Sequence, residues 1–343
     1  MKYFPNGYKP ILNQKETEGA IKFIKDTFQS ELSGELKLSR VTAPLFVEKN
    51  SGVNDDLSGI ERPVSFEVKA LNNKKMEIVH SLAKWKRMAL ADGGFEEGTG
   101  LYTDMNAIRA DDMMDAIHSI YVDQWDWERV IQKSEYNLEF LKKIVSKIYS
   151  SIKRTEFLLT ERYPLLHRRM ARNIEFIHSE DALGMFPNLS AEEREKALAK
   201  KYGAVFIIGI GATLKDGKPH GLRAPDYDNW SEDVDGVHKG LNGDIILWDD
   251  VRNDSIELSS MGIRVNKDAL LRQLEICKCT ERKNLYWHKR LLNGDFPLTI
   301  GGGIGQSRVC MYLLHKAHIG EVQSSIWSDE ILKEAKLLGV SIL

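Results

Sequence analysis

The apolar positions near the start of the chain repeat with the spacing of an amphipathic helix. Asn13 and Glu16 match a helix N-terminal capping box, and the residues after them place four apolar side chains on one face: Ile21, Ile24, Phe28 and Leu32. We expect this helix to end at Gly34. The alternation over Leu36–Val41 predicts a short strand that ends before Pro44, because proline cannot continue a hydrogen-bonded ladder.

Further along the chain, helical and strand-like patterns mix without a regular rhythm. The apolar spacing predicts helices over Ser81–Leu90, within Trp127–Phe157, and from a capping box at Ser190 and Glu193 to Tyr202. The second half predicts strands over Ala204–Ile210, Asp244–Trp248, Ser255–Val265 and Leu298–Ile304, with helices over Lys267–Cys277 and Ser307–Lys316. This order favours an α+β fold with an antiparallel sheet flanked by helices, and no linker divides residues 1–343 into separate domains.

Composition narrows the class of protein. The chain has 343 residues, 29% of them charged, and a net charge of −2, which argues against a surface built to bind nucleic acid. The longest strongly apolar stretch, Val205–Ala212, is far shorter than the roughly 20 residues of a membrane helix. The three cysteines, Cys277, Cys279 and Cys310, are too few for a disulfide framework. We therefore expect a cytoplasmic protein that binds neither nucleic acid nor membranes.

Two common nucleotide-binding motifs are absent. A P-loop needs four residues between its glycines, whereas Gly211 and Gly217 have five between them, and Lys218 is followed by proline. The run Gly301–Gln306 lacks the last glycine of the dinucleotide-binding fingerprint. Cys277, Cys279 and Cys310 also lack the paired spacing of a zinc site.

Several segments nevertheless carry candidate chemistry. Gly301–Arg308 is a glycine-rich strand leading into a helix, which indicates a close approach by another backbone or by a ligand. Arg308 at the helix start favours a phosphate ligand. Asp244 and Glu257 are carboxylates on strands and could hold Mg²⁺ with phosphates, although an isolated Glu is more often a solvated edge residue. A bulge near Gly262 would be needed to bring Glu257 and Arg264 to one face.

Other polar segments are ambiguous when taken singly. The alternation over Tyr121–Glu128 places Gln124, Asp126 and Glu128 on one strand face and two tryptophans on the other. That polar face is either solvated or the floor of a pocket. Arg223–Asp228 has the composition of an ordinary turn, and the cationic helix over His80–Arg87 is typical of a surface face.

Taken together and in this order, these segments closely resemble the family of ammonia-dependent asparagine synthetases, also called aspartate–ammonia ligases. The resemblance runs from about Lys15 to the C-terminus and includes Leu241–Asp244 and Glu257–Val265. That family resembles the catalytic domain of class II aminoacyl-tRNA synthetases. The helix and strand before Pro44 are similar to the first class II motif and Gly301–Arg308 to the third. Gly100–Arg109 is similar to the second, although Arg109-Ala110-Asp111 replaces its usual Arg-x-Glu.

The resemblance implies a reaction in two steps. ATP and the β-carboxylate of aspartate would give β-aspartyl-adenylate and pyrophosphate, and ammonia would then release asparagine and AMP. The implied residues for ATP are Arg109, Arg223, Asp228, Asp244, Glu257, Ser260 and Arg308, with Mg²⁺ on Glu257 and Asp244. Those implied for aspartate are Asp55, Ser81, Lys86, Gln124, Asp126 and Arg264. Asp55 would face the β-group and the incoming ammonia, and Asp55, Lys86, Arg109, Gln124 and Arg308 are the residues implied in catalysis.

The same resemblance leaves an alternative function and implies a subunit arrangement. An aspartyl- or asparaginyl-tRNA synthetase-like paralogue is the alternative, although the catalytic unit uses nearly all 343 residues and leaves no room for an anticodon-binding domain. Ammonia rather than glutamine is the expected nitrogen donor, because glutamine use needs a nucleophilic thiol and a second site. By analogy with class II enzymes we expect a homodimer formed through the helix and strand before Pro44.

Overall fold

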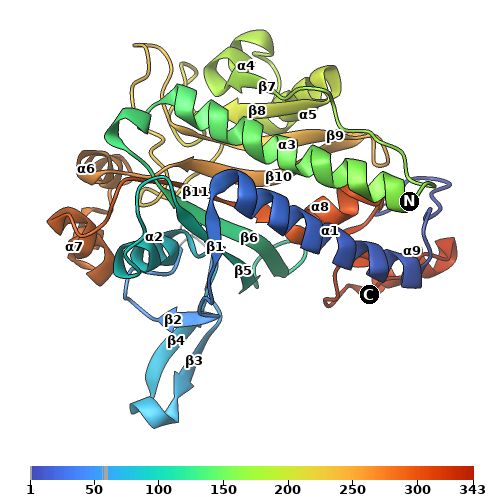
Figure 1. Ribbon diagram of the computed structural model, residues 1–343, viewed down its shortest axis with the longest axis horizontal. Coiled ribbons are helices and arrows are strands. Elements are labelled where there is room, and N and C mark those ends of the chain that lie inside the picture. Colours follow the sequence, from blue (N-terminus) through green and yellow to red (C-terminus); the bar gives the residue numbers. More distant parts are fainter. Residues whose placement is uncertain (1, 56, 58–60) are drawn as a thin grey trace.

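The centre of the fold is an eight-stranded sheet. The computed structural model describes residues 2–55, 57 and 61–343, and its large sheet has the strand order β1-β5-β6-β11-β10-β9-β8-β7 (Figure 1). The strands are β1 (Leu38–Arg40), β5 (Gly100–Ile108), β6 (Tyr121–Val130), β7 (Glu175–His178), β8 (Ala204–Ile208), β9 (Asn242–Asp249), β10 (Asp254–Ile263) and β11 (Thr299–Gly305). The pairs from β5 to β8 are antiparallel, and only the edge strands β1 and β7 pair in parallel. The expected antiparallel α+β sheet is confirmed.

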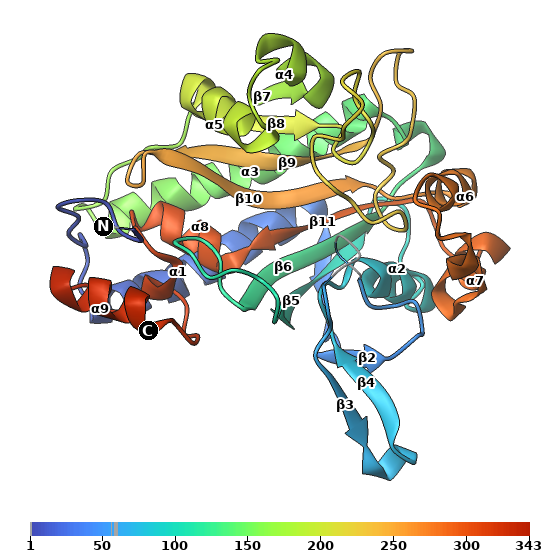
Figure 2. The ribbon, with the colours of Figure 1, turned by 180° about the vertical axis from the view of Figure 1, so that it is seen from behind.

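Helices cover the sheet unevenly. The two longest helices, α1 (Gln14–Leu36) and α3 (Leu138–Arg162), lie side by side across one face (Figure 1). The remaining helices are α2 (Ala83–Asp92), α4 (Ser179–Met185), α5 (Ala191–Tyr202), α6 (Lys267–Ile276), α7 (Tyr286–Asn293), α8 (Gln306–Leu313) and α9 (Asp329–Leu338). Seen from behind, α1 and α3 lie beyond the sheet, and α2, α6 and α7 gather at one end of it (Figure 2). In the described residues no helix combines the length and the apolar character needed to cross a membrane.

A second, smaller sheet projects from the body of the molecule. It has the order β2-β4-β3, with β2 (Phe46–Glu48), β4 (Lys74–Ile78) and β3 (Ser65–Val68) (Figure 2). Single 3₁₀ turns lie at Lys69–Leu71, Lys133–Glu135, Thr280–Asn284 and Ile319–Glu321. Because β2 and β4 flank residues 49–73, the small sheet carries the segment that includes Asp55.

The alternation along β6 decides which face of the large sheet can hold a site. Trp125 and Trp127 are completely buried, and the ring of Trp125 lies 4.6 Å from that of Phe28 on α1. Since side chains alternate along a strand, Gln124 and Asp126 point to the opposite face, away from α1. The polar face of β6 predicted from the sequence is therefore the face that α1 does not cover.

Two predicted helices are present but differ from the prediction at their ends. The helix expected within Trp127–Phe157 begins only at Leu138, because β6 continues to Val130 with β5 on one side and β11 on the other. Gly34 does not end the first helix, which continues to Leu36 and ends at Lys37 in the left-handed conformation, with φ of 56°. In both places long-range packing overrides the local signal.

Candidate active site

Two adjoining cavities lie against the uncovered face of the sheet. The larger has a volume of about 430 Å³ and the smaller about 240 Å³. Four residues line both of them: Arg109, Gln124, Glu257 and Gly303. A molecule in one cavity can therefore meet a molecule in the other at the point where these four residues come together.

The smaller cavity contains a buried lysine from α2. Lys86 is fully buried, and its Nζ donates to the backbone carbonyls of Trp127 at 2.9 Å and Gly302 at 3.0 Å and to the Asp126 carboxylate. Burial lowers the pKa of Lys86, because a charged amine is costly to remove from water. The interpretation of this cationic helix as a surface face is wrong: Lys84, Lys86 and Arg87 are all buried.

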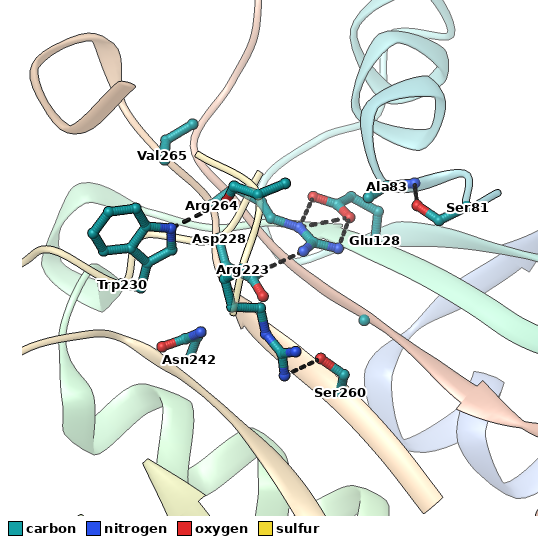
Figure 3. A network of polar contacts seen from close by, with 12 residues as sticks. Ser81, Ala83, Glu128, Arg223, Asp228, Trp230, Asn242, Ser260, Arg264 and Val265 are labelled. Carbon is teal, nitrogen blue, oxygen red and sulfur yellow. Dashed lines mark hydrogen bonds and ion pairs between the residues drawn. The ribbon is translucent and has the colours of Figure 1, made fainter. Parts of the chain in front are cut away.

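Arg264 lies between two buried carboxylates (Figure 3). Its Nε and Nη2 donate to Glu128 at 3.0 and 2.8 Å, and its Nη1 donates to Asp228 at 2.5 Å. Burial alone would raise the pKa of Glu128, but the charges of Arg264 and Lys86 bring it below its ordinary value. The guanidinium plane of Arg264 is thus fixed at the wall of the smaller cavity.

Arg223 also lines the smaller cavity, and its Nη2 donates to Ser260 Oγ at 3.0 Å (Figure 3). The same Nη2 donates to the Asp244 carboxylate. Asp244 itself lines neither cavity. The pKa of Asp244 is raised to about 7, because the effect of burial is larger than the opposing effect of the Arg223 charge. In this arrangement the contact that Asp244 makes with the site runs through Arg223.

The bulge on β10 brings Glu257 toward the site, although not where it was expected. The register with β9 shifts between Glu257 and Ser259, rather than near Gly262. Arg264 lies just beyond the end of the strand, where it pairs with Asp228. Glu257 and Arg264 consequently both line the smaller cavity.

Arg109 and Arg308 are the cations of the larger cavity that the sequence singled out. Arg109 follows β5, and its Nη2 donates to the carbonyl of His80 at 3.2 Å, while its buried Nε has no hydrogen-bond partner among the described residues. Arg308 lies in the first turn of α8, and its Nη1 donates to the carbonyl of Glu257 at 3.0 Å and lies 3.5 Å from Oε2 of the same residue. Both guanidinium groups have donors left over for a ligand.

The glycines of β11 let the polar side chains of β6 cross the strand. A Cβ on Gly301 would overlap the carboxylate of Glu128, and a Cβ on Gly303 would overlap the amide of Gln124. Glycine is thus required where another side chain packs directly on the backbone. The close approach that the glycine run indicated is made by β6 side chains within the site.

A model of the aspartate–ammonia ligase family matches residues 15–338. The chain belongs to this family. It is 59% identical to the aspartate–ammonia ligase of Parabacteroides distasonis over 339 residues, which cover 99% of this chain and 98% of that one. The ligase of Clostridium perfringens is 52% identical over 341 residues, covering 99% of both chains.

Solved structures show the same fold at low identity. The asparaginyl-tRNA synthetase from Pyrococcus horikoshii, complexed with asparaginyl-adenylate, superimposes with a TM-score of 0.67 at 15% identity, covering 90% of this chain and 68% of that one. The aspartyl-tRNA synthetase from Entamoeba histolytica has a TM-score of 0.59 at 15% identity, covering 90% and 58%. The expected class II fold and the expected family of C–N bond-forming ligases are confirmed.

In this ligase family member, the structure gathers nearly all the sequence-predicted site residues but divides them differently. The smaller cavity is lined by the predicted aspartate residues together with five that were expected for ATP. Arg109 and Glu257 line both cavities, whereas Arg223, Asp228 and Ser260 line only the smaller one. Arg308 lines the larger cavity, and Asp244 lies behind Arg223. The roles of these residues remain predictions.

Asp55 lies at the wall of the smaller cavity and is 4% exposed. Its Oδ1 accepts the Leu57 N–H at 3.0 Å, which is the contact of a loop cap. Burial raises the pKa of Asp55, and the nearby charge of Lys84 opposes that rise. Asp56, Ser58 and Gly59 of the same predicted segment lie outside the described residues.

Sequence reasoning missed a buried network behind Asp55. Lys84 Nζ donates to Asp226 Oδ2 at 3.2 Å, and Nε2 of His288 lies 3.0 Å from the same oxygen. Tyr227 and Leu222 line the smaller cavity and were also not singled out. A lysine in the first turn of a helix is usually solvated. The sequence therefore contains no sign of this network, which is apparent only from the burial of Lys84 in the folded chain.

The described residues offer a divalent cation few protein ligands. In the described part of the chain no group of three or more His, Cys, Asp or Glu residues could hold a metal ion. Mg²⁺ usually needs only one or two carboxylates when phosphates supply further oxygens. Glu257 fits that requirement, because its side chain is 42% exposed and lines both cavities.

Proposed function

We propose that the chain joins ammonia to the β-carboxylate of aspartate in two steps, first forming β-aspartyl-adenylate and pyrophosphate and then asparagine and AMP. The observation that carries this proposal is the pair of cavities that meet at Arg109, Gln124, Glu257 and Gly303. A carboxylate is a poor electrophile, so its oxygen must reach the α-phosphate of ATP before ammonia can attack. Adjoining cavities that share the Arg109 guanidinium allow that contact.

We assign aspartate to the smaller cavity. Arg264 would meet its α-carboxylate and Asp126 its α-ammonium, with Ser81, Lys86 and Gln124 around them. Lys86 and Arg264 are already held by Asp126, Glu128 and backbone carbonyls. The site is therefore organised before aspartate binds and loses little side-chain entropy when it does.

We assign ATP to the larger cavity, with its α-phosphate at the shared boundary. Arg109 would bind the α-phosphate, because it lines both cavities, and Arg308 would bind the outer phosphates. Negative charge develops on phosphate oxygens during the transfer, and oriented guanidinium groups stabilise it. Arg223, Asp228 and Ser260 would meet the adenylate from the aspartate side.

Glu257 is the residue that would hold Mg²⁺ beside the phosphates. When bound, the ion supplies positive charge that the phosphate oxygens share. Asp244 remains a proposed second ligand, but it would first have to leave Arg223. The carboxylate of Glu257 also forms an ion pair with Arg308 at 3.5 Å, so it orients that guanidinium whether or not the ion is present.

Asp55 would act in the second step. At neutral pH the donor exists mainly as ammonium, which has no lone pair. A carboxylate at the β-group would attract the cation and take one proton from it; the ammonia so formed would attack the β-carbonyl and displace AMP, with a second proton released to solvent. Ammonia rather than glutamine remains the proposed donor. Faster asparagine formation from glutamine than from ammonium salts would contradict this assignment.

The adenylate can be tested with isotopic oxygen. Aspartate labelled with ¹⁸O in its β-carboxylate, incubated with ATP, ammonium and Mg²⁺, should transfer one labelled oxygen to AMP. Formation of ADP, or label in pyrophosphate instead of AMP, would refute the two-step route. A parallel reaction with tRNA distinguishes the ligase from a synthetase-like paralogue, because only the latter would form aminoacyl-tRNA.

We further propose a cytoplasmic homodimer in which residues 1–343 form one catalytic domain. The three cysteines are free thiols, which fits a reducing compartment. Leu45 and Phe46, which directly follow Pro44, are 51% and 45% exposed, and apolar side chains at such exposure favour an interface there. Sedimentation equilibrium at micromolar concentration should give twice the chain mass, and the mass of a single chain would contradict the dimer.

A further inference from the structure

A buried hydrogen-bond network forms the base of the larger cavity. Ser119, Asp123, Ser307 and Gln323 all line this cavity, and their exposed fractions are 3%, 6%, 2% and 4%. They come from distant parts of the chain: the segment between β5 and β6, β6 itself, the first turn of α8, and the stretch after the 3₁₀ turn Ile319–Glu321. None of the four was singled out by the sequence as a site residue.

Gln323 joins two of these parts through its single amide group. Its Nε2 donates to Ser307 Oγ at 3.0 Å, and its Oε1 accepts from Ser119 Oγ at 2.6 Å. Ser307 is held in turn by Asp123, which accepts its backbone N–H at 3.0 Å and its hydroxyl at 2.8 Å. Each polar atom of the Gln323 amide therefore has a protein partner, so its function is to hold other groups in place.

The two serines held by Gln323 lie in the chain segments that carry the two arginines of the cavity. Ser307 directly precedes Arg308, and Ser119 is near the end of the segment that starts at Arg109. A second link supports the same connection, because the N–H of Ile319 donates to the carbonyl of Ala116 at 2.8 Å. The spacing between the two cations thus depends on the stretch around residues 319–323, although neither arginine contacts Gln323.

We propose that Gln323 is a positioning residue for ATP, which sets the distance between the Arg109 and Arg308 guanidinium groups by clamping Ser119 to Ser307. This inference rests on the proposed function, which places ATP in the larger cavity. Its physical basis is that a buried amide with partners at both ends fixes the distance between them. An apolar side chain of similar size would remove the link between Ser119 and Ser307, although each serine keeps its own partner, Tyr121 or Asp123. Gln323 lines only the larger cavity, so its loss should affect the binding of ATP more than that of aspartate.

Gln323→Leu is the primary test, because it keeps the volume and removes both hydrogen bonds. In aspartate-dependent ATP–pyrophosphate exchange, KM for ATP should rise about 10-fold, as expected from the loss of one or two buried hydrogen bonds, while KM for aspartate stays within about twofold. Gln306→Leu is the matched control. Gln306 directly precedes Ser307, and its buried amide donates to Asp104 at 2.9 Å. It lines neither cavity, so its replacement should leave both Michaelis constants unchanged.

A carboxylate at position 323 gives a second test. Gln323→Glu places a second carboxylate beside Asp123, whose Oδ1 lies 3.5 Å from the Gln323 amide nitrogen, and should raise KM for ATP at least as much as Gln323→Leu. A merely structural role predicts equal rises of both Michaelis constants instead.

The outcomes separate this inference from the proposed function. If the wild-type chain shows no aspartate-dependent exchange, the proposed function fails. If the wild type exchanges normally but Gln323→Leu leaves KM for ATP unchanged, only the positioning role is refuted. Equal rises of both Michaelis constants in Gln323→Leu also overturn it, and circular dichroism of each variant checks that the fold is retained.

Discussion

Replacing Asp55 by Asn separates the two proposed half-reactions. The substitution keeps the size of the side chain and an Oδ1 that can accept the Leu57 N–H, now 3.0 Å away, so the loop cap is preserved. It removes the negative charge from a residue that is 4% exposed and faces the positive charge of Lys84. The change therefore tests charge at the position where ammonia is proposed to enter.

The expected magnitude follows from the environment of the carboxylate. Burial raises the pKa of Asp55, which makes it a stronger base than a solvated aspartate. General-base catalysis contributes about 10²- to 10⁴-fold, so asparagine formation should fall at least about 100-fold in Asp55→Asn, or roughly 2.7 kcal/mol of activation free energy. Adenylate formation needs no base at this position and should change less than about threefold.

The assay measures pyrophosphate and asparagine in the same reaction. Wild type should give equal yields, whereas Asp55→Asn should release pyrophosphate and form little asparagine. Asp112→Asn is the matched control, because Asp112 is a carboxylate that lines only the larger cavity and should not change the ratio. Equal yields of the two products in Asp55→Asn would show that Asp55 is only a loop cap.

The pH dependence of the product ratio is a second test of Asp55 as a base. Because burial raises the pKa of Asp55, its carboxylate takes up a proton at a higher pH than a solvated aspartate would. The ratio of asparagine to pyrophosphate should therefore fall on acidification in the wild type, over and above the loss of free ammonia. In Asp55→Asn the ratio should follow ammonia alone, and parallel profiles would contradict the proposed base.

Three further substitutions test other parts of the site. Arg308→Lys should slow adenylate formation about 100-fold, because lysine lacks the planar fork that meets two phosphate oxygens, and near-normal pyrophosphate release would count against this. Gly303→Ala should raise KM for aspartate in the exchange assay, because a Cβ there overlaps the amide on the facing strand, whereas Gly305→Ala, where the nearest atom would be 3.4 Å away, should not. Glu128→Gln weakens the buried pair with Arg264, held at 2.8 Å, and should lower the free energy of unfolding in urea by about 3 kcal/mol; an unchanged midpoint would refute the importance of the pair.

Local patterns in the sequence determined the identity of most elements and the polarity of the key strand. The alternation over Tyr121–Glu128 correctly separated the tryptophans from Gln124 and Asp126, because the side-chain period of a strand is fixed by backbone geometry. The glycine run in β11 indicated a close approach, and the ordered series of motifs identified the ligase family.

Tertiary structure alone decided which charges are buried and which cavity they line. Lys84 and Lys86 lie in what reads as a solvated helix, and their burial depends on carboxylates at Asp226 and Asp126, far away in the sequence. The end of β6 at Val130 was likewise set by strands on both sides. Arg223 lines the smaller cavity because strand pairing and the β10 bulge place its partner Ser260 there. The physical reason is common to all of these: periodicity is a property of neighbouring residues, whereas the desolvation and pairing of a charge depend on groups that only the folded chain brings within a few ångströms.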